Sequence, residues 1–201
     1  MSNQYWSADL HISHKNVIGH NNRPFSCIEE HDQAMIDNIN NTCTRKDTLN
    51  IIGDFAWNDH GKWLAAIKCK KVLISGSHDR MAQKYLDCFT AVYDMRIMKH
   101  QHEILVMAHC PFRTWERSHY GSVLLHGHCH RRLETWNLSF DVGVDTHDYK
   151  PYAWDELKPM IDKRRDEMRA AGRVVTEDRT GKVLWRQDDV RFWKDKYDKK
   201  E

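Results

Sequence analysis

The sequence lacks the features that mark membrane proteins, secreted proteins and disulfide-bonded scaffolds. No apolar run approaches the roughly 20 residues that a membrane-spanning helix needs. The N-terminal stretch MSNQYWSAD has neither a basic segment nor an apolar one, so no secretory signal is predicted. The six cysteines are scattered and include no CxxC pair. This pattern favours reduced thiols and a cytoplasmic location.

An excess of charge of one sign is also absent. The 31 Lys and Arg residues nearly balance the 29 Asp and Glu residues, which leaves a formal net charge of +2. This balance gives no general reason to expect binding to nucleic acid or to a membrane, and no specific protein partner is predicted. Linkers, repeats and low-complexity segments are missing too. A chain of 201 residues is therefore expected to form a single domain over 1–201.

Five short apolar runs are present, and each leads into Asp, His or Ser side chains. They cover residues 4–8, 48–52, 70–75, 103–108 and 122–125. Their Val, Ile, Leu and Trp content is typical of strands that are buried on both faces. Helical patterns lie between the first runs: one follows a predicted capping box of Ser26 and Glu29, and others lie near 63–67 and 80–88. This alternation predicts a layered α/β fold.

The second half of the chain has a different pattern. Residues 90–145 resemble consecutive strands, and 153–171 a long charged helix. The stretch VVTEDRTGKVLW, at 174–185, predicts a β-hairpin that turns near Thr180 and Gly181. The last dozen residues are expected to form a charged helical tail.

The stretch LLHGHCHRR, at 124–132, places His126, His128 and His130 at alternate positions after an apolar run. In extended backbone such residues point to one side, whereas Cys129 points to the other. Neutral imidazoles suit a transition metal, but buried histidines with hydrogen-bond partners would explain this patch equally well. Binding sites in open α/β sheets form beyond the carboxyl ends of the strands. Five strand ends that carry ligand-type residues together favour a polynuclear metal site.

These residues resemble the calcineurin-like metallophosphoesterases in their order and approximate spacing. The matching motifs are Asp9-x-His11, Gly53-Asp54, Gly76-Ser77-His78-Asp79, His109 and Gly127-His128-x-His130. The resemblance covers about residues 4–150, and SADLHISHKNVI with RPF at 23–25 looks most like the small bacterial and phage-type members. It implies an α/β (α+β) fold, a β-sandwich of two mixed sheets flanked by helices. Periodicity alone would suggest a doubly wound sheet instead.

The resemblance implies two divalent transition-metal ions, which could be Mn, Fe, Zn, Ni or Co. One ion would be held by Asp9, His11, Asp54 and His130. The other would be held by Asp54, Ser77, His109 and His128, so that Asp54 bridges the two. In the family an asparagine usually stands where this chain has Ser77. A serine hydroxyl is a shorter and poorer ligand, so the second site is expected to be weaker.

The resemblance further implies hydrolysis of phosphate esters by a hydroxide that bridges the two metals. We expect diesters, with nucleotide-like or nucleic-acid-derived ones as candidates, because no cap that would select a small monoester is evident. His78 is the implied general acid, and Asp79 would hold its other ring nitrogen. His14 and Arg23 are candidate substrate contacts. A local structural role explains His14 equally well, and a structural role is favoured for Arg23. Trp57 and Trp115 are candidate pocket walls.

Two other functional classes remain to be weighed. Ser77 would suit a catalytically weakened, metal-binding scaffold of the same fold, but a scaffold does not require His78 or the histidine ligands. A structural zinc protein is disfavoured, because structural zinc sites prefer closely spaced, cysteine-rich ligands. The sequence therefore favours a metal-dependent phosphoesterase.

Overall fold

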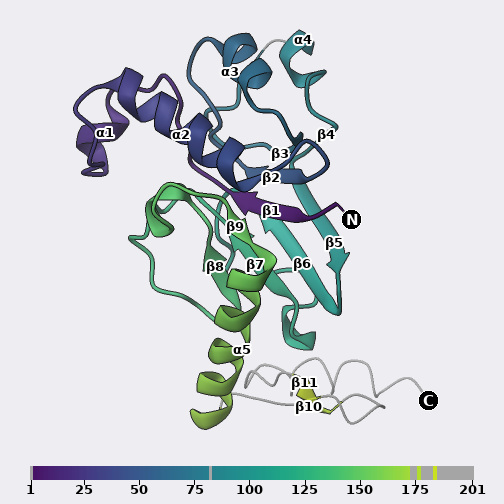
Figure 1. Ribbon diagram of the computed structural model, residues 1–201. Helices are drawn as coiled ribbons and strands as arrows, with labels where there is room; N and C mark the ends of the chain where they lie inside the picture. Colours follow the sequence, from purple (N-terminus) through teal and green to yellow (C-terminus); the bar gives the residue numbers. More distant parts are fainter. Residues whose placement is uncertain (1, 82, 173–175, 178–182, 185–201) are drawn as a thin grey trace.

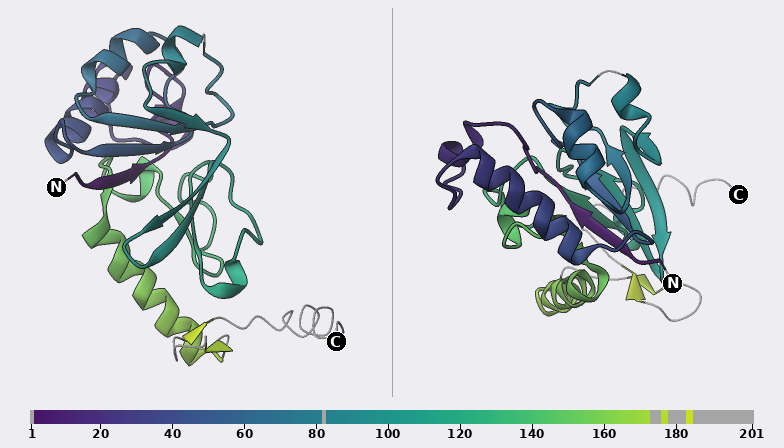
Figure 2. Two further views of the ribbon diagram at one scale, coloured as in Figure 1. Left: turned by 90° about the vertical axis from the view of Figure 1, so that its right-hand side faces the viewer. Right: turned by 45° about the horizontal axis from the view of Figure 1, so that its top comes forward.

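The computed structural model describes residues 2–81, 83–172, 176–177 and 183–184. Two β-sheets pack face to face, with helices α1 to α4 beside the first sheet and α5 beside the second (Figure 1; Figure 2). No helix in this part of the chain is long and apolar enough to cross a membrane. All six cysteines are free.

Both sheets are mixed, as the resemblance implied. The first has the order β4 (Ala91–Tyr93), β3 (Lys70–Ile74), β2 (Thr48–Ile52), β1 (Gln4–Ser7), β9 (Tyr152–Ala153). Its strands β1 to β4 run parallel, and β9 is antiparallel to β1. The second has the order β5 (Met95–His100), β6 (Glu103–Ala108), β7 (Val123–His126), β8 (Ser139–Asp141). Here β5 is antiparallel to β6, and β6, β7 and β8 run parallel.

The helices are α1 (Val17–His20), α2 (Ile28–Thr42), α3 (His60–Ala66), α4 (Gln83–Leu86) and α5 (Trp154–Ala170), with the 3-10 turns η1 (Ser118–Tyr120) and η2 (Val144–Thr146). The predicted capping box is wrong by one residue. The Ser26 amide and hydroxyl donate to Glu30, at 2.7 and 2.6 Å, and α2 begins after Cys27. The predicted hairpin is present as β10 (Thr176–Glu177) paired with β11 (Val183–Leu184). Its turn and the charged tail lie outside the described residues.

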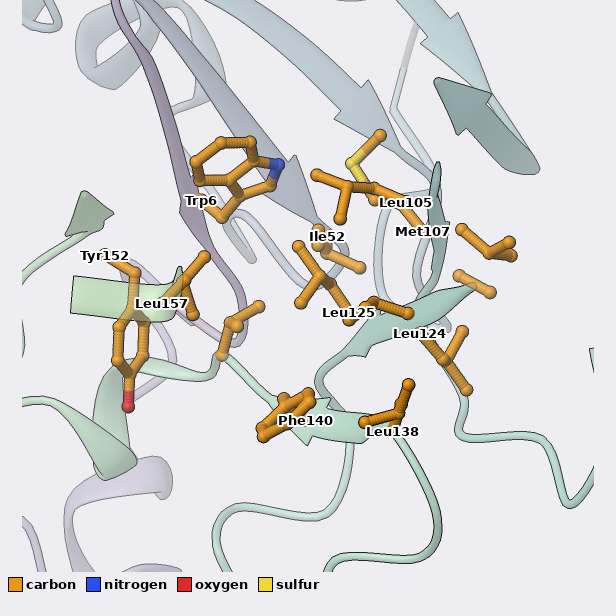
Figure 3. Close-up of a cluster of buried hydrophobic side chains, with 14 of the residues drawn as sticks. Trp6, Ile52, Leu105, Met107, Leu124, Leu125, Leu138, Phe140, Tyr152 and Leu157 are labelled. Atoms are coloured by element: carbon orange, nitrogen blue, oxygen red, sulfur yellow. The ribbon is translucent and has the colours of Figure 1, made fainter. Parts of the chain in front are cut away.

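The core is divided by the first sheet. Because side chains of a strand alternate between faces, Leu49 and Ile51 of β2 pack with Met35 of α2, while Ile52 faces the second sheet. Figure 3 shows the layer between the sheets, which includes Trp6, Ile52, Leu105, Met107 and Leu125. Each such side chain contributes roughly 1.5–3 kcal/mol by burial. Helix α5 adds Leu157 and Ile161 to the same cluster. This packing fixes the strands whose ends carry the polar residues.

Candidate metal centre

The loops that follow β1, β2 and β7 are joined by hydrogen bonds at one edge of the sandwich. The amide of Asp9 donates to the carbonyl oxygen of Gly53 at 3.0 Å, and that of His11 to Asp54 at 2.9 Å. The amide of His128 donates to the carboxylate of Asp9, with 2.9 Å to each oxygen. This last bond joins a loop of the first sheet to a loop of the second.

Two groups of side chains at this edge could each hold a metal ion. Asp9, His11 and His130 form one group, and Asp9, Asp54 and His109 the other; within each, the ligand atoms lie within 4.8 Å of one another. Oδ2 of Asp54 is 3.5 Å from Nε2 of His11 and 3.3 Å from Nε2 of His109. The fold thus brings together five of the seven predicted ligands. Asp9 is shared by both groups, and Asp54 lies between a histidine of each.

The imidazoles of these groups are oriented for a ligand. In the described part of the chain, Nε2 of His11 and Nε2 of His109 are buried and have no hydrogen-bond partner. The opposite nitrogen of His109 donates to the carbonyl oxygen of Ile52 at 3.0 Å. Nδ1 of His130 lies 2.7 Å from the carboxylate of Asp145. Buried polar atoms are rarely left unpaired, so these nitrogens, aimed at carboxylates, fit a bound cation.

The electrostatics of the site also fit a cation. Burial raises the pKa of Asp9 to about 7. Burial alone would lower the pKa of His109, but the carboxylate of Asp54, 3.3 Å from its Nε2, raises it to about 9. Asp54 responds in the opposite sense: burial acts to raise its pKa, yet His109 and the amide of His78 hold it below the usual range. In the metal-free protein, protons therefore supply the positive charge that a metal would supply.

Strained backbone is concentrated at the same residues. Five predicted ligands lie in the left-handed region: Asp9 (φ 56°), His11 (50°), Asp54 (56°), His128 (69°) and His130 (46°). This conformation costs a non-glycine residue roughly 1–2 kcal/mol, and such strain clusters at functional sites. Strand β7 ends at His126, so the predicted same-side alignment of three histidines in extended backbone is wrong. His126 itself is buried against the carbonyl oxygen of Gly127.

Gly53 and Gly127 of the motifs lie where a side chain would overlap the candidate ligands. Gly53 has φ +84°, and a Cβ added there would overlap the ring of His109. A Cβ on Gly127 would lie 2.7 Å from Oδ2 of Asp9. The Gly-Asp and Gly-His pairs are therefore needed for the backbone to pass this close to the ligands.

The remaining predicted ligands and the predicted acid line the rim. Ser77, His78 and His128 are exposed. Nε2 of His78 lies 3.9 Å from Oδ2 of Asp54, and its side chain is 39% exposed. The ring of His128 has its centre 5.1 Å from that of His109. His78 thus stands where a group entering the site from solvent would meet it.

The predicted role of Asp79 is wrong. Its carboxylate accepts hydrogen bonds from the amides of Gly76, Asp54 and Phe55, at 2.7, 2.8 and 2.8 Å. Among the described residues, no hydrogen bond joins it to the ring of His78. Because backbone amides occupy both of its oxygens, Asp79 shapes the loop and does not set the tautomer of His78.

Arg23 is likewise a positioning residue and not a substrate contact. It is 3% exposed, and its guanidinium has a partner for each of its five N–H groups. Two go to the carboxylate of Asp145, at 2.9 and 2.7 Å, and one lies 2.7 Å from Nε2 of His31. The other two go to the carbonyl oxygens of Asp9 and Leu10. No donor is left for a phosphate.

Two further predictions concern aromatic residues. The prediction that Trp115 forms a pocket wall is wrong. Its side chain is 8% exposed, and its indole donates to the carbonyl oxygen of Ser122 inside the core. His14 does reach the site, with its ring centre 5.4 Å from that of His11 and 4.7 Å from that of Trp57.

The sequence patterns above do not predict Asp145 as a residue of the site. Its signal was present, since SFDVGVD repeats the pattern of an apolar run that ends in acidic residues.

Comparisons with known proteins give relatives whose names state no activity. No family model matches the chain. An uncharacterized protein of Methanocaldococcus jannaschii is 26% identical over 171 residues, which cover 79% of this chain and 91% of the relative. The gene 66 protein of Mycobacterium phage D29 is 27% identical over 199 residues, covering 82% and 95%.

One comparison with a solved structure shows the fold. A protein of unknown function from Aquifex aeolicus superposes with a TM-score of 0.62 at 24% identity, covering 80% of this chain and all of that one. A Pseudomonas putida nuclease MPE (22% identity, 65% and 64% covered) and the E. coli phosphoesterase Yfce (13%, 70% and 77%) give TM-scores of 0.40 and 0.44. TM-scores of 0.40 and 0.44 are too low to support a conclusion about fold or activity. The chain is thus similar to an archaeal and a phage protein, and it shares the fold of the Aquifex protein.

Proposed function

We propose that this chain is a metal-dependent phosphoesterase with two divalent transition-metal ions. One observation carries the proposal: two ligand groups share Asp9, and the buried Nε2 atoms of His11 and His109, which have no hydrogen-bond partner among the described residues, face the carboxylate of Asp54. The exposed ring of His78 stands beside them. A structural zinc site would be closed and cysteine-rich, whereas this one is built from carboxylates and imidazoles and opens to solvent.

The residues divide into two sets around the carboxylates. Asp9, His11 and His130 would hold one ion, and Asp9, Asp54 and His109 the other, with His128 and Ser77 completing the shell of the second ion from the rim. Two such cations, when bound, lower the pKa of water and neutralise the charge of phosphoryl oxygens. Asp145, Arg23 and Asp79 hold the ligands and their loops in place.

His78 is the proposed general acid. In the hydrolysis, the oxygen of a water forms a bond to phosphorus as the bond to the leaving oxygen breaks. The leaving oxygen takes the proton of His78, and the proton of the water passes to solvent. A protonated ring next to Asp54 would also stabilise the negative charge that develops on the leaving oxygen. Its 39% exposed side chain lets a substrate approach without rearrangement of the core.

The substrate is proposed to be a phosphodiester, with nucleotide-like diesters as candidates. The predicted general acid and both rim ligands are exposed, so a second substituent on phosphorus would have room to extend into solvent.

The test is hydrolysis of bis-p-nitrophenyl phosphate and of p-nitrophenyl phosphate by the full chain. The protein is stripped of metal and reloaded separately with Mn, Ni, Co, Zn and Mg, and bound metal is counted by mass spectrometry. The variant Asp54→Asn should lose metal and turnover. Asp166→Asn, an exposed substitution on α5, is the matched control and should change neither.

Turnover with about two ions per chain supports the proposal, and preference for the first ester supports a diesterase. Absence of turnover with every metal, or binding of at most one ion, overturns it. In that case Ser77 has disabled the second site, and the chain is a metal-binding scaffold of this fold.

A further inference from the structure

Trp57 is a large aromatic residue that takes no part in the core. Its side chain is 48% exposed, and it belongs to neither of the two buried hydrophobic clusters. Its backbone is nevertheless fixed, because its amide donates to the carbonyl oxygen of Ile12 at 2.8 Å, next to the bridge between Ile12 and Ala56. Leaving so much apolar surface in water is unfavourable, and packing does not account for it.

The indole is oriented by two histidines of the site. It stacks on the ring of His14, with centres 4.7 Å apart and planes 13° apart. Its centre is 5.1 Å from that of His78, and His14 and His78 are 6.0 Å apart. We name these three side chains the aromatic wall. The wall begins at the predicted acid and ends at an exposed indole.

We propose that Trp57 stacks a planar ring carried by the leaving group, and that the leaving alcohol is a nucleoside. This inference rests on the proposed function. The atom next to His78 in the reaction is the leaving oxygen, so the substituent that contacts the aromatic wall is the leaving group. An exposed indole binds any nucleobase by its face and needs no hydrogen-bond readout. A simple alkyl alcohol would leave the indole uncovered.

The test uses methyl thymidine-5′-phosphate, a diester with one flat substituent and one small one. If thymidine leaves, the products are thymidine and methyl phosphate. If methanol leaves, the products are methanol and thymidine monophosphate. We expect the first pair to dominate for the Mn-loaded protein by about tenfold, a ratio of the size that one base stacked on one aromatic residue provides.

Three variants separate stacking from general packing. Trp57→Leu keeps an apolar side chain but removes the plane, and should lower the product ratio about tenfold. Trp57→Phe keeps a plane and should retain most of the ratio. Tyr120→Leu, which changes another exposed aromatic residue, just before β7 and therefore at the opposite end of that strand from the site, should leave the ratio unchanged. Thermal melting should be equal in all variants.

Predominance of thymidine monophosphate in the unmodified protein, or an unchanged ratio in Trp57→Leu, overturns the inference while the proposed function stands. Loss of all turnover with every metal overturns the proposed function. In that event, calorimetric titration with thymidine alone still decides the stacking role. Binding that Trp57→Leu weakens about tenfold supports it, and binding that is absent or unaltered overturns it.

Discussion

The ring nitrogen Nδ1 of His130 lies 2.7 Å from Oδ2 of Asp145, and the same carboxylate receives two hydrogen bonds from Arg23. A carboxylate behind a metal-binding histidine fixes its tautomer and its orientation. The contact therefore joins a predicted ligand to a buried ion pair that reaches on to His31. His31 in turn contacts Asp32, whose carboxylate accepts the amide of Ser13.

Replacement of Asp145 by Asn should weaken both metal binding and the fold. The pKa of Asp145 would rise on burial alone, but His130 and Arg23 hold it at about 2, below its ordinary 3.8. Its ion pairs thus stabilise the protein above about pH 4, and this stabilisation is lost as the pH falls through about 2. We expect a loss of about 2 kcal/mol in unfolding free energy at pH 7.

Denaturant unfolding of the metal-free protein between pH 2 and 7 measures this effect, and the difference from the unmodified chain should shrink below pH 4. Metal affinity should fall about 10- to 100-fold. Asp166→Asn is the control. A variant that matches the unmodified chain at pH 7 in both stability and metal affinity contradicts the expected role.

Metal binding should release protons in a pH-dependent manner. In the metal-free protein Asp9 and His109 have raised pKa values, about 7 and about 9, and both must lose a proton to become ligands. Metal binding at pH 6 should therefore release about two protons, and metal binding above pH 9 should release fewer. The affinity for the metal should rise with pH across this range. Calorimetry in buffers of different ionisation enthalpy counts the protons. Equal release at pH 6 and above pH 9 would show that these groups are not ligands.

His78→Ala should affect substrates according to their leaving groups. A poor leaving group needs a proton in the transition state, so turnover of alkyl esters should fall about 10²- to 10⁴-fold. Aryl esters with an acidic phenol need the proton less and should lose much less activity. The control is His102→Ala, an exposed residue in the turn between β5 and β6. Equal losses on both kinds of ester count against the acid role.

Ser77→Asn should strengthen the second metal site. An amide oxygen reaches further than a serine hydroxyl and is the better neutral ligand. We expect the dissociation constant of the weaker metal site to drop about tenfold, equivalent to about 1.4 kcal/mol. Titration of the stripped protein with Mn, followed by mass spectrometry, gives both constants. An unaltered constant means that position 77 does not contact the metal.

The strands and most candidate metal ligands follow from local sequence patterns. Each of the five apolar runs forms a strand, and each strand end carries the residue that the pattern predicted. The arrangement in two sheets does not follow from periodicity, because Ile51 and Ile52 face different layers and both are simply apolar in the sequence. The family resemblance supplied that step.

The roles of supporting residues depend on contacts between distant parts of the chain. Arg23 and Asp145 are 122 positions apart, and no local signal pairs them. The sequence places Asp79 next to His78 and suggests a hydrogen bond between their side chains. In the structure the carboxylate of Asp79 accepts hydrogen bonds from the amides of Asp54 and Phe55 instead. The backbone is left-handed at His128 and His130, so the side chains of residues 126–130 do not alternate between two sides as they would in a strand.

The hydrogen bond from His128 to Asp9 has a mechanical consequence. Asp9, His11 and Asp54 follow strands of one sheet, whereas His109, His128 and His130 follow strands of the other. Ions shared between these sets would cross-link the two halves of the sandwich. Chelation should then do more than stop turnover: the amides at the ends of β1 and β6 should exchange with solvent faster, while those at the far ends of the same strands stay protected.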